Sequence, residues 1–368
     1  MGVKIKASYL APPAEPTWHG IHPLSESDQI GMVTHVHIIH FYRKVGCRDW
    51  PNPPDEIIGI IKDSLSRALV PFYPLAGRLR RVDGGGKLEL ECNAKGVEFI
   101  EAESSQLMSD FGDFSSFKGF EDLFPRVDYS KPIQDHPLCL VQLTWFRCGG
   151  FALGTAISHI VADMDGLGAT HFLCEWARLA HGDPLEASPC IDRTVLHARR
   201  KTLIEKSPNV LRHIDFFPPL PTLMGGGDNS KEQNKEIIAK VLTLTKSQVD
   251  MLKMAANRET QHDGAKKVSE SCQDQGSEVS IEDDFLMAGN PNVMVSSWLN
   301  LPVRGMDFGW GKEICMAPAT HYFDADIVIL PGYVEDGSVV VFVALQVAHM
   351  EKFKKSFYKD IELFVGHS

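Results

Sequence analysis

The segment from Leu138 to His159 constrains the fold most. It holds two apolar stretches, LCLVQLTWF and FALGTAIS, on either side of Cys148-Gly149-Gly150. Two apolar runs that flank a glycine turn are typical of a β-hairpin, and their nearly continuous apolar character indicates a buried one. The second strand delivers His159 at its end. From residue 166 to 179, apolar residues recur at helical spacing, so we predict a helix there, with Gly182 just past its end.

Strand and helix signals alternate through the rest of the first half. Residues 33–43 are rich in β-branched and aromatic side chains and predict a strand, whereas residues 54–72 carry apolar residues at helical spacing behind a proline and predict a helix. Residues 78–102 predict successive short strands with turns between them. Gly84-Gly85-Gly86 fits a turn rather than a phosphate-binding loop, because no helix or Lys-Ser/Thr pair follows it.

A change of composition marks a boundary between two domains. Residues 185–235 contain FFPPLP followed by GGGDNSKEQNK, which is typical of a connector. We therefore predict an N-terminal domain over residues 1–184, a crossover linker over 185–235 and a C-terminal domain over 236–368. An α/β fold follows from the alternation of elements.

Local signals also assign elements in the second half. Residues 236–244 predict a strand, and Thr245 with Gln248 forms a capping box that opens a helix. Residues 258–284 have almost no apolar residue and predict a mobile loop. IVILPG and SVVVFVALQVA, on either side of an Asp-Gly turn, predict a hairpin, and HMEKFKKSFYKDIELF predicts a closing surface helix with one apolar face rather than a basic binding patch.

Composition and charge exclude several classes of protein. The apolar fraction of 43% and the charged fraction of 23% are ordinary for a soluble globular enzyme. The net charge of -11 argues against nucleic acid or an anionic membrane as a partner. No apolar run approaches the roughly 20 residues of a membrane helix, and the N-terminus lacks the apolar core of a signal peptide. Eight scattered cysteines without C-x-x-C spacing indicate free thiols, so we expect a cytoplasmic protein.

Histidines near other polar residues raise the question of a metal site. His35, His37 and His40 are close in sequence, but on a strand only the first two share a face, so we predict a partly buried strand. His159 and Asp163 stand in H-x-x-x-D spacing, and no further ligand follows at the spacing that zinc needs. We predict no metal. A histidine near an aspartate is, on physical grounds alone, more often a structural pair than a catalytic one.

Two motifs favour a catalytic role for His159 over a structural one. The string Asp307-Phe308-Gly309-Trp310-Gly311 and the stretch SHIVADMDG around His159 match, in the same order, the two signature motifs of the BAHD family of acyl-CoA-dependent acyltransferases. Further matches are LSESD from residue 24, YPLAGRL from residue 73 and SWL from residue 297. The chain thus resembles this family over nearly its whole length.

The resemblance implies two similar chloramphenicol-acetyltransferase-like domains, each of a mixed sheet plus helices, with His159 in a channel open to both faces. The imidazole would act as a general base on the acceptor, with no covalent acyl-enzyme. Acyl-CoA would be a co-substrate, and no cofactor is implied. Ser296 and Trp298 would contact the reacting carbonyl, although a core aromatic is an equally open interpretation of Trp298. Asp163 and Gly166 would shape the catalytic loop.

The remaining motif residues are expected to be structural. Asp307, Phe308, Gly309, Trp310 and Gly311 would build a turn, in which the two glycines permit the backbone conformation and the two aromatic rings pack.

The sequence departs from the family pattern in two places. Met164 stands where the family has a glycine, and Asp165-Gly166 follows. Between residue 258 and Ser296, family members carry a longer stretch with a helix, a strand that bears an Asp-x-Arg partner for the loop aspartate, and another long helix. This chain has no Asp-x-Arg sequence there. Asp163 would lack its arginine, and the second domain would be incomplete, as in a shortened product.

The acceptor is predicted from one position and from the two ends of the chain. Asn300 occupies the place of an arginine that holds the acceptor carboxylate in relatives that acylate shikimate or quinate. The opening KASYLAPPAEP and the closing segment look most like spermidine hydroxycinnamoyl transferases. We therefore predict the transfer of a hydroxycinnamoyl group from CoA to an amine of a polyamine. We also expect the protein to be a monomer. Two alternatives stay open: an O-acyltransferase for an alcohol or shikimate-type acceptor, and a catalytically impaired shortened form.

Overall fold

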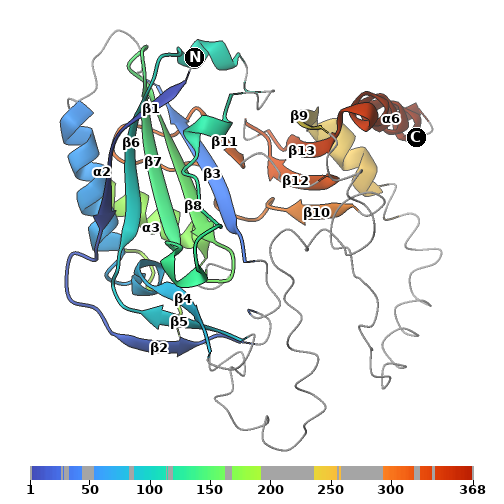
Figure 1. Cartoon of the computed structure of the whole chain (residues 1–368). Helices are drawn as coiled ribbons and strands as arrows, with labels where there is room; N and C mark the ends of the chain where they lie inside the picture. The colour runs from blue at the N-terminus through green and yellow to red at the C-terminus, as the bar shows by residue number, and fades with distance from the viewer. Residues whose placement is uncertain are drawn as a thin grey trace, which may run out of the picture. The chain divides into compact units, whose positions relative to one another are not determined.

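The computed structural model describes residues 2–25, 28, 33–43, 54–82, 87–112, 114, 119–161, 168–191, 236–254, 257, 293–318, 324–333 and 336–366 (Figure 1). These residues form two units. The first contains the described residues up to 191 together with 301–318, and the second contains those of 236–300 and 324–366. Within the described ranges, none of the helices has both the length and the hydropathy that a bilayer span requires.

A six-stranded sheet is the main element of the first unit (Figure 1). Only β6 and β7 are parallel, and every other neighbouring pair is antiparallel. The predicted hairpin is present as β7 and β8, and β8 is buried at every residue. The strands, in spatial order, are β1 (Val3–Ala11), β6 (Val97–Ser104), β7 (Cys139–Phe146), β8 (Phe151–Ser158), β3 (His35–Tyr42) and β11 (Cys315–Pro318).

Two helices of the first unit pack against each other. Helix α2 (Pro54–Ala68) begins with a proline and has two acidic residues in its first turn, which suits the N-terminal end of a helix dipole. Helix α3 (Ala169–His181) ends at Gly182, whose φ of 101° is a left-handed conformation that favours glycine. The indole Nε1 of Trp176 on α3 donates a hydrogen bond to Ser64 Oγ on α2 at 3.0 Å. This buried bond fixes α3 on α2.

An aromatic cluster packs around Phe41 in the first unit. The Phe41 ring lies 4.8 to 6.2 Å, centroid to centroid, from the rings of Phe111, Phe114, Phe120 and Phe146. The segment that supplies three of these rings contains short 3-10 turns, η2 (Met108–Phe111), η3 (Glu121–Leu123) and η4 (Ile133–Asp135). It comes so close to β8 that a Cβ on Gly154 would lie 2.4 Å from the carbonyl oxygen of Leu123.

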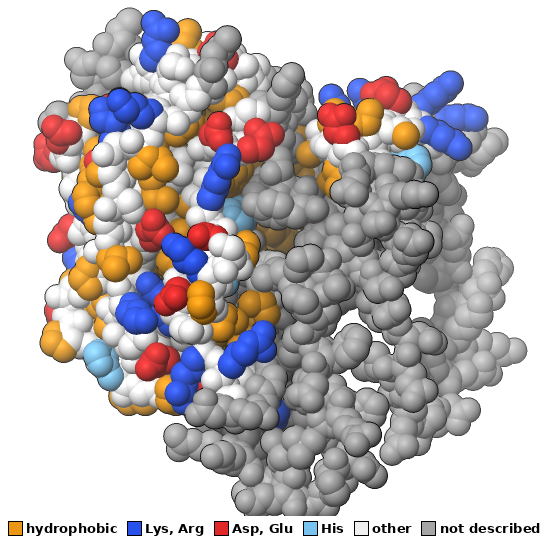
Figure 2. Space-filling view, viewed as in Figure 1, with side chains coloured by type: hydrophobic (Ala, Val, Ile, Leu, Met, Phe, Trp, Pro, Cys, Tyr) orange, Lys and Arg blue, Asp and Glu red, His pale blue; other side chains and the backbone are white. Residues whose placement is uncertain are grey.

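A small sheet completes the first unit. Its strands are, in spatial order, β2 (Gly20–Pro23), β5 (Leu88–Cys92) and β4 (Arg78–Arg81), and η1 (Tyr73–Ala76) leads into β4. On the face of the first unit that Figure 2 shows, acidic and basic side chains are interspersed.

The second unit is a four-stranded sheet with an apolar core against helix α6 (Val347–Gly366). The predicted hairpin is β12 and β13, and the predicted capping box is confirmed, because Thr245 N–H donates to Gln248 Oε1 at 2.9 Å. Only β10 and β12 are parallel. The strands, in spatial order, are β10 (Met294–Ser297), β12 (Asp326–Pro331), β13 (Val339–Gln346) and β9 (Ile237–Leu244).

Among the described residues, burial varies across the face of this sheet that meets α6. On the face that meets α6, Val341 and Val343 of β13 are buried, Ile327 and Ile329 of β12 are half-buried, and Val295 of β10 is 56% exposed. The apolar burial therefore decreases from β13 to β10.

The segment that carries DFGWG differs from the expected domain plan. We predict it as part of the C-terminal domain, whereas residues 301–318 belong to the first unit. The reason is strand pairing, since β11 adds to the edge of β3 with Cys315 opposite Phe41. Most of the predicted linker, residues 192–235, and the predicted loop at 258–284 lie outside the described residues.

Candidate active site

His159 lies directly after the last residue of β8. Its backbone N–H donates to Thr34 O at 2.9 Å, and the N–H of Ser158 donates to Leu138 O at 2.7 Å. The strand is therefore held on both sides up to the residue that carries the imidazole, and the His159 side chain is half-buried. A fixed backbone under an accessible imidazole suits a group that exchanges protons with a bound molecule. Asp163 and Gly166 lie outside the described residues.

Protein partners hold the three histidines of β3. The ring of His35 bonds Tyr129 Oη at 2.9 Å and Pro137 O at 2.8 Å. His37 Nδ1 donates to His35 O at 3.0 Å, and His40 Nε2 donates to Val303 O at 3.2 Å. Burial lowers the pKa of His35 to about 3 and the pKa of His37 to about 4, so both rings are neutral near pH 7.

Lowering the pH from 7 to 4 should destabilise the protein through His35 and His37. Their ordinary pKa of 6.5 applies to the unfolded chain, whereas their folded values are about 3 and about 4. Below pH 6.5 the unfolded state binds more protons, so the free energy of unfolding falls by up to about 1.4 kcal/mol per pH unit for each histidine. Urea denaturation at pH 7, 6, 5 and 4 measures this dependence.

The variant His37→Phe separates this effect from general acid sensitivity. It keeps a ring in the same buried place but does not titrate, so the free energy of unfolding should depend less steeply on pH. The comparison uses the slopes rather than the absolute stabilities. Equal slopes for the variant and the wild type between pH 6 and 4.5 would contradict the assignment.

The DFGWG motif forms a closed turn around one carboxylate. Asp307 Oδ1 accepts the backbone N–H groups of Gly309 at 2.8 Å and Gly311 at 2.9 Å. Gly309 has a φ of 103° and Gly311 a φ of 96°, which any other residue would adopt only with strain. The Phe308 ring packs edge-on against Trp176 of α3 at 5.1 Å, and the Trp310 ring lies 6.2 Å from Phe151 of β8. The motif thus touches both the strand before His159 and the helix after it.

Side chains that the sequence does not single out hold this segment in place. Glu313 accepts the N–H groups of Gly305 at 2.7 Å and Met306 at 2.8 Å. Tyr42 Oη donates to Met306 O at 2.9 Å, across 264 positions of sequence. No local pattern could have predicted Glu313 or Tyr42, because each acts on the backbone of a turn that only the tertiary structure brings near.

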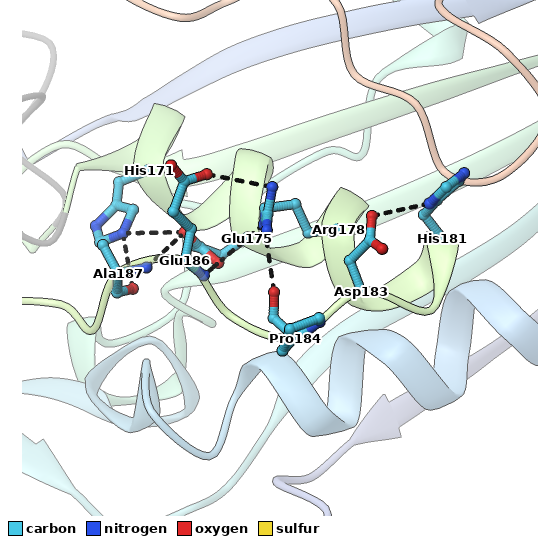
Figure 3. A network of polar contacts seen from close by, with 8 residues as sticks. All are labelled: His171, Glu175, Arg178, His181, Asp183, Pro184, Glu186 and Ala187. Atoms are coloured by element: carbon cyan, nitrogen blue, oxygen red, sulfur yellow. Dashed lines mark hydrogen bonds and ion pairs between the residues drawn. The ribbon is translucent and has the colours of Figure 1, made fainter.

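A polar network joins α3 to the residues that follow it (Figure 3). The Glu175 carboxylate is buried and accepts the backbone N–H groups of Glu186 at 3.0 Å and Ala187 at 3.1 Å. Arg178 donates to Pro184 O at 3.3 Å and forms an ion pair with Glu186 at 3.2 Å, while His171 Nε2 donates to Ala187 O at 3.1 Å. The first residues of the predicted linker are therefore fixed on α3.

Ser296, Trp298 and Asn300 lie in the second unit. Ser296 is half-buried in β10, and Trp298, two residues later, is 9% exposed and donates its backbone N–H to Ile329 O at 2.8 Å. Because alternate residues of a strand share a face, both side chains lie on the less exposed side of β10. Asn300 is exposed in the turn after this strand.

Known proteins are similar to this chain along its length. A family model described as "Transferase family" matches residues 1–272 and 269–360. Hydroxycinnamoyl-CoA:piscidic acid hydroxycinnamoyltransferase of Actaea racemosa is 32% identical over 98% of this chain and 100% of that protein. Shikimate O-hydroxycinnamoyltransferase of Nicotiana tabacum is 30% identical over 97% and 100%, and a hydroxycinnamoyl-CoA:5-hydroxyanthranilate N-hydroxycinnamoyltransferase of Avena sativa is 29% identical over 88% and 92%.

A solved structure agrees on the fold. The crystal structure of vinorine synthase matches 95% of this chain and 96% of its own with a TM-score of 0.65 at 18% identity. At this identity the likeness concerns the fold alone, and it confirms the mixed α/β architecture.

The alignments also locate a shortening of the chain. The alignment with the Actaea racemosa protein extends over 460 positions, whereas this chain has 368 residues. The difference means that at least 92 positions of the alignment are gaps in this chain. The two stretches that match the family model meet at residues 269–272. Together these findings indicate a chain that is shorter than this relative internally, near residue 270.

Proposed function

We propose a reaction for this chain, which belongs to the BAHD family of acyltransferases: the transfer of a hydroxycinnamoyl group from its CoA thioester to an amine of a polyamine such as spermidine. The observation that carries the proposal is the half-buried His159 at the end of β8, in a motif that matches the family base. The three similar enzymes named above all have hydroxycinnamoyltransferase in their names, which supports the donor.

His159 acts as the general base in this proposal. Its imidazole takes a proton from the attacking amine, the nitrogen bonds to the thioester carbonyl carbon, the carbon–sulfur bond breaks, and the proton leaves with the CoA thiol. A thioester is already an activated acyl donor, so alignment, proton removal and stabilisation of the oxyanion suffice. Ser296 and Trp298 are the proposed contacts of the oxyanion. The proposed enzyme is a cytoplasmic monomer that needs no cofactor.

Asn300 supports an amine acceptor over an acidic one. Its side chain carries no charge, and a carboxylate without a cationic partner is held weakly. The net charge of -11 favours a cationic acceptor. An O-acceptor is the second candidate, because a shikimate O-hydroxycinnamoyltransferase is 30% identical over 97% of this chain. A catalytically impaired form is the third, because of the shortening near residue 270.

An acceptor panel should show the fastest CoA release with spermidine. Purified protein receives p-coumaroyl-CoA or feruloyl-CoA with spermidine, shikimate or a plain alcohol, and free CoA thiol and product mass are measured. The matched variant Asn300→Arg adds a cation where the acceptor carboxylate would be held, so it should lower the ratio of spermidine to shikimate turnover about tenfold, or about 1.4 kcal/mol.

Other results of this assay would favour one of the two alternative functions. Faster release with shikimate or the alcohol than with spermidine would replace the amine acceptor with an O-acceptor. A cooperatively folded protein that releases no CoA with any of the three would leave the impaired form.

A further inference from the structure

We propose that Tyr129 and His35 are positioning residues that set the backbone of His159 through one shared peptide group. The inference rests on the proposed role of His159 as the base. The sequence does not single out Tyr129, and it assigns His35 only to a partly buried strand. All of the contacts lie within the first unit.

The shared group is the peptide between Thr34 and His35, just before and at the start of β3. Its carbonyl oxygen accepts the N–H of His159 at 2.9 Å, and its own N–H donates to Tyr129 Oη at 3.1 Å. A peptide group is a rigid plane, because its C–N bond has partial double-bond character. A tilt that changes the bond to Tyr129 therefore also moves the oxygen that holds His159.

The hydroxyl of Tyr129 is held in turn by the ring of His35. Pro137 O can only accept, so His35 Nε2 carries the hydrogen and donates it at 2.8 Å. The other ring nitrogen, Nδ1, then accepts the O–H of Tyr129 at 2.9 Å. Burial keeps this ring neutral, with a pKa of about 3, so the arrangement persists over the working pH range. The direction of every hydrogen bond from Pro137 to His159 is thus determined.

Removing the hydroxyl would disturb the start of β3. Without it, His35 Nδ1 and the His35 N–H both lose this partner in a half-buried place, where a polar group left without a partner is unfavourable. We expect the Thr34–His35 peptide to tilt so that its N–H finds another acceptor, and this tilt shifts the backbone of His159. Because a displacement of about 1 Å at a reacting group can cost 10²-fold in rate, we expect a smaller shift to lower kcat about tenfold.

The variant Tyr129→Phe should lower kcat about tenfold in the assay with p-coumaroyl-CoA and spermidine and leave KM for both substrates within twofold. Rates are divided by the folded fraction from circular dichroism, so that general instability does not count. The matched control is Tyr9→Phe, which removes a hydroxyl that bonds Glu101 on β6 and should leave kcat unchanged. His35→Gln, which keeps a donor and an acceptor, should retain more activity than His35→Leu.

A spectroscopic measurement covers the case of an inactive chain. With ¹³C-labelled histidine, the ring signal of His159 is assigned from its loss in His159→Ala. Tyr129→Phe should change the chemical shift of that signal, and Tyr9→Phe should not. A His159 signal that is unchanged in Tyr129→Phe overturns the positioning proposal, as does wild-type kcat in that variant or an equal loss in Tyr9→Phe. His159→Ala with wild-type activity would instead remove the proposed base.

Discussion

The variant His159→Ala should reduce kcat for hydroxycinnamoyl transfer by about 10²- to 10⁴-fold, which is the usual contribution of a general base. The backbone of His159 is fixed by hydrogen bonds that do not involve its side chain, so the substitution should leave the sheet intact. The half-buried imidazole makes the loss of packing small. Release of CoA at saturating substrate, together with a thermal melting curve, tests both expectations.

Two further variants sharpen this result. His19→Ala removes an exposed histidine of the same unit and should keep wild-type kcat. His159→Gln keeps a hydrogen-bonding side chain of similar length but cannot accept the proton at neutral pH, so it should be nearly as slow as His159→Ala. A His159→Gln variant with wild-type kcat would show that the ring positions the substrate and does not take a proton.

The variant Phe308→Ala should lower the free energy of unfolding by about 3–5 kcal/mol, the usual cost of removing a buried phenylalanine side chain. Phe308 is 2% exposed, and its ring packs edge-on against Trp176 at 5.1 Å and Tyr42 at 6.1 Å. Without this ring, Trp176 of α3 and Tyr42 of β3 both lose their contact with the DFGWG motif. Urea denaturation followed by tryptophan fluorescence measures the loss, since Trp176 lies at the site of the change.

Conservative and exposed substitutions serve as controls for Phe308. Phe308→Leu keeps much of the buried volume and should cost under about 1.5 kcal/mol. Tyr333→Ala removes an aromatic ring that is 42% exposed and should change stability by about 0.5 kcal/mol. A Phe308→Ala loss no greater than that of Tyr333→Ala would contradict the packing of the motif against α3 and β3.

Local patterns predict much of the fold. The strand at 33–43 is present as β3 (His35–Tyr42), and the helix at 54–72 is present as α2 (Pro54–Ala68). Thr245 and Gln248 bond each other as the capping box requires. Each of these features depends on residues within a few positions of one another, so periodicity and capping chemistry suffice to predict it.

Features that depend on distant partners are not predicted. Strand β1 (Val3–Ala11) pairs with β6, and β11 pairs with β3, yet neither pairing leaves a local signal. The same holds for the candidate site. The sequence places His159 at the end of a strand, but Tyr129 meets His35, 94 positions away, only in the folded chain. Asp163 and Gly166, outside the described residues, stay predictions.

The pairing of β11 with β3 has a consequence for biosynthesis. Tyr42 is the last residue of β3, and its hydrogen-bond partner Met306 is translated 264 positions later. Strand β11 follows Met306 in the sequence. At ribosomal rates this interval lasts on the order of 10 to 60 s, during which the outer edge of β3 lacks its native neighbour. An open strand edge is a template for pairing with other chains. The N-terminal sheet therefore reaches its six-stranded form only after β11 has been translated, and termination before residue 315 leaves that edge exposed.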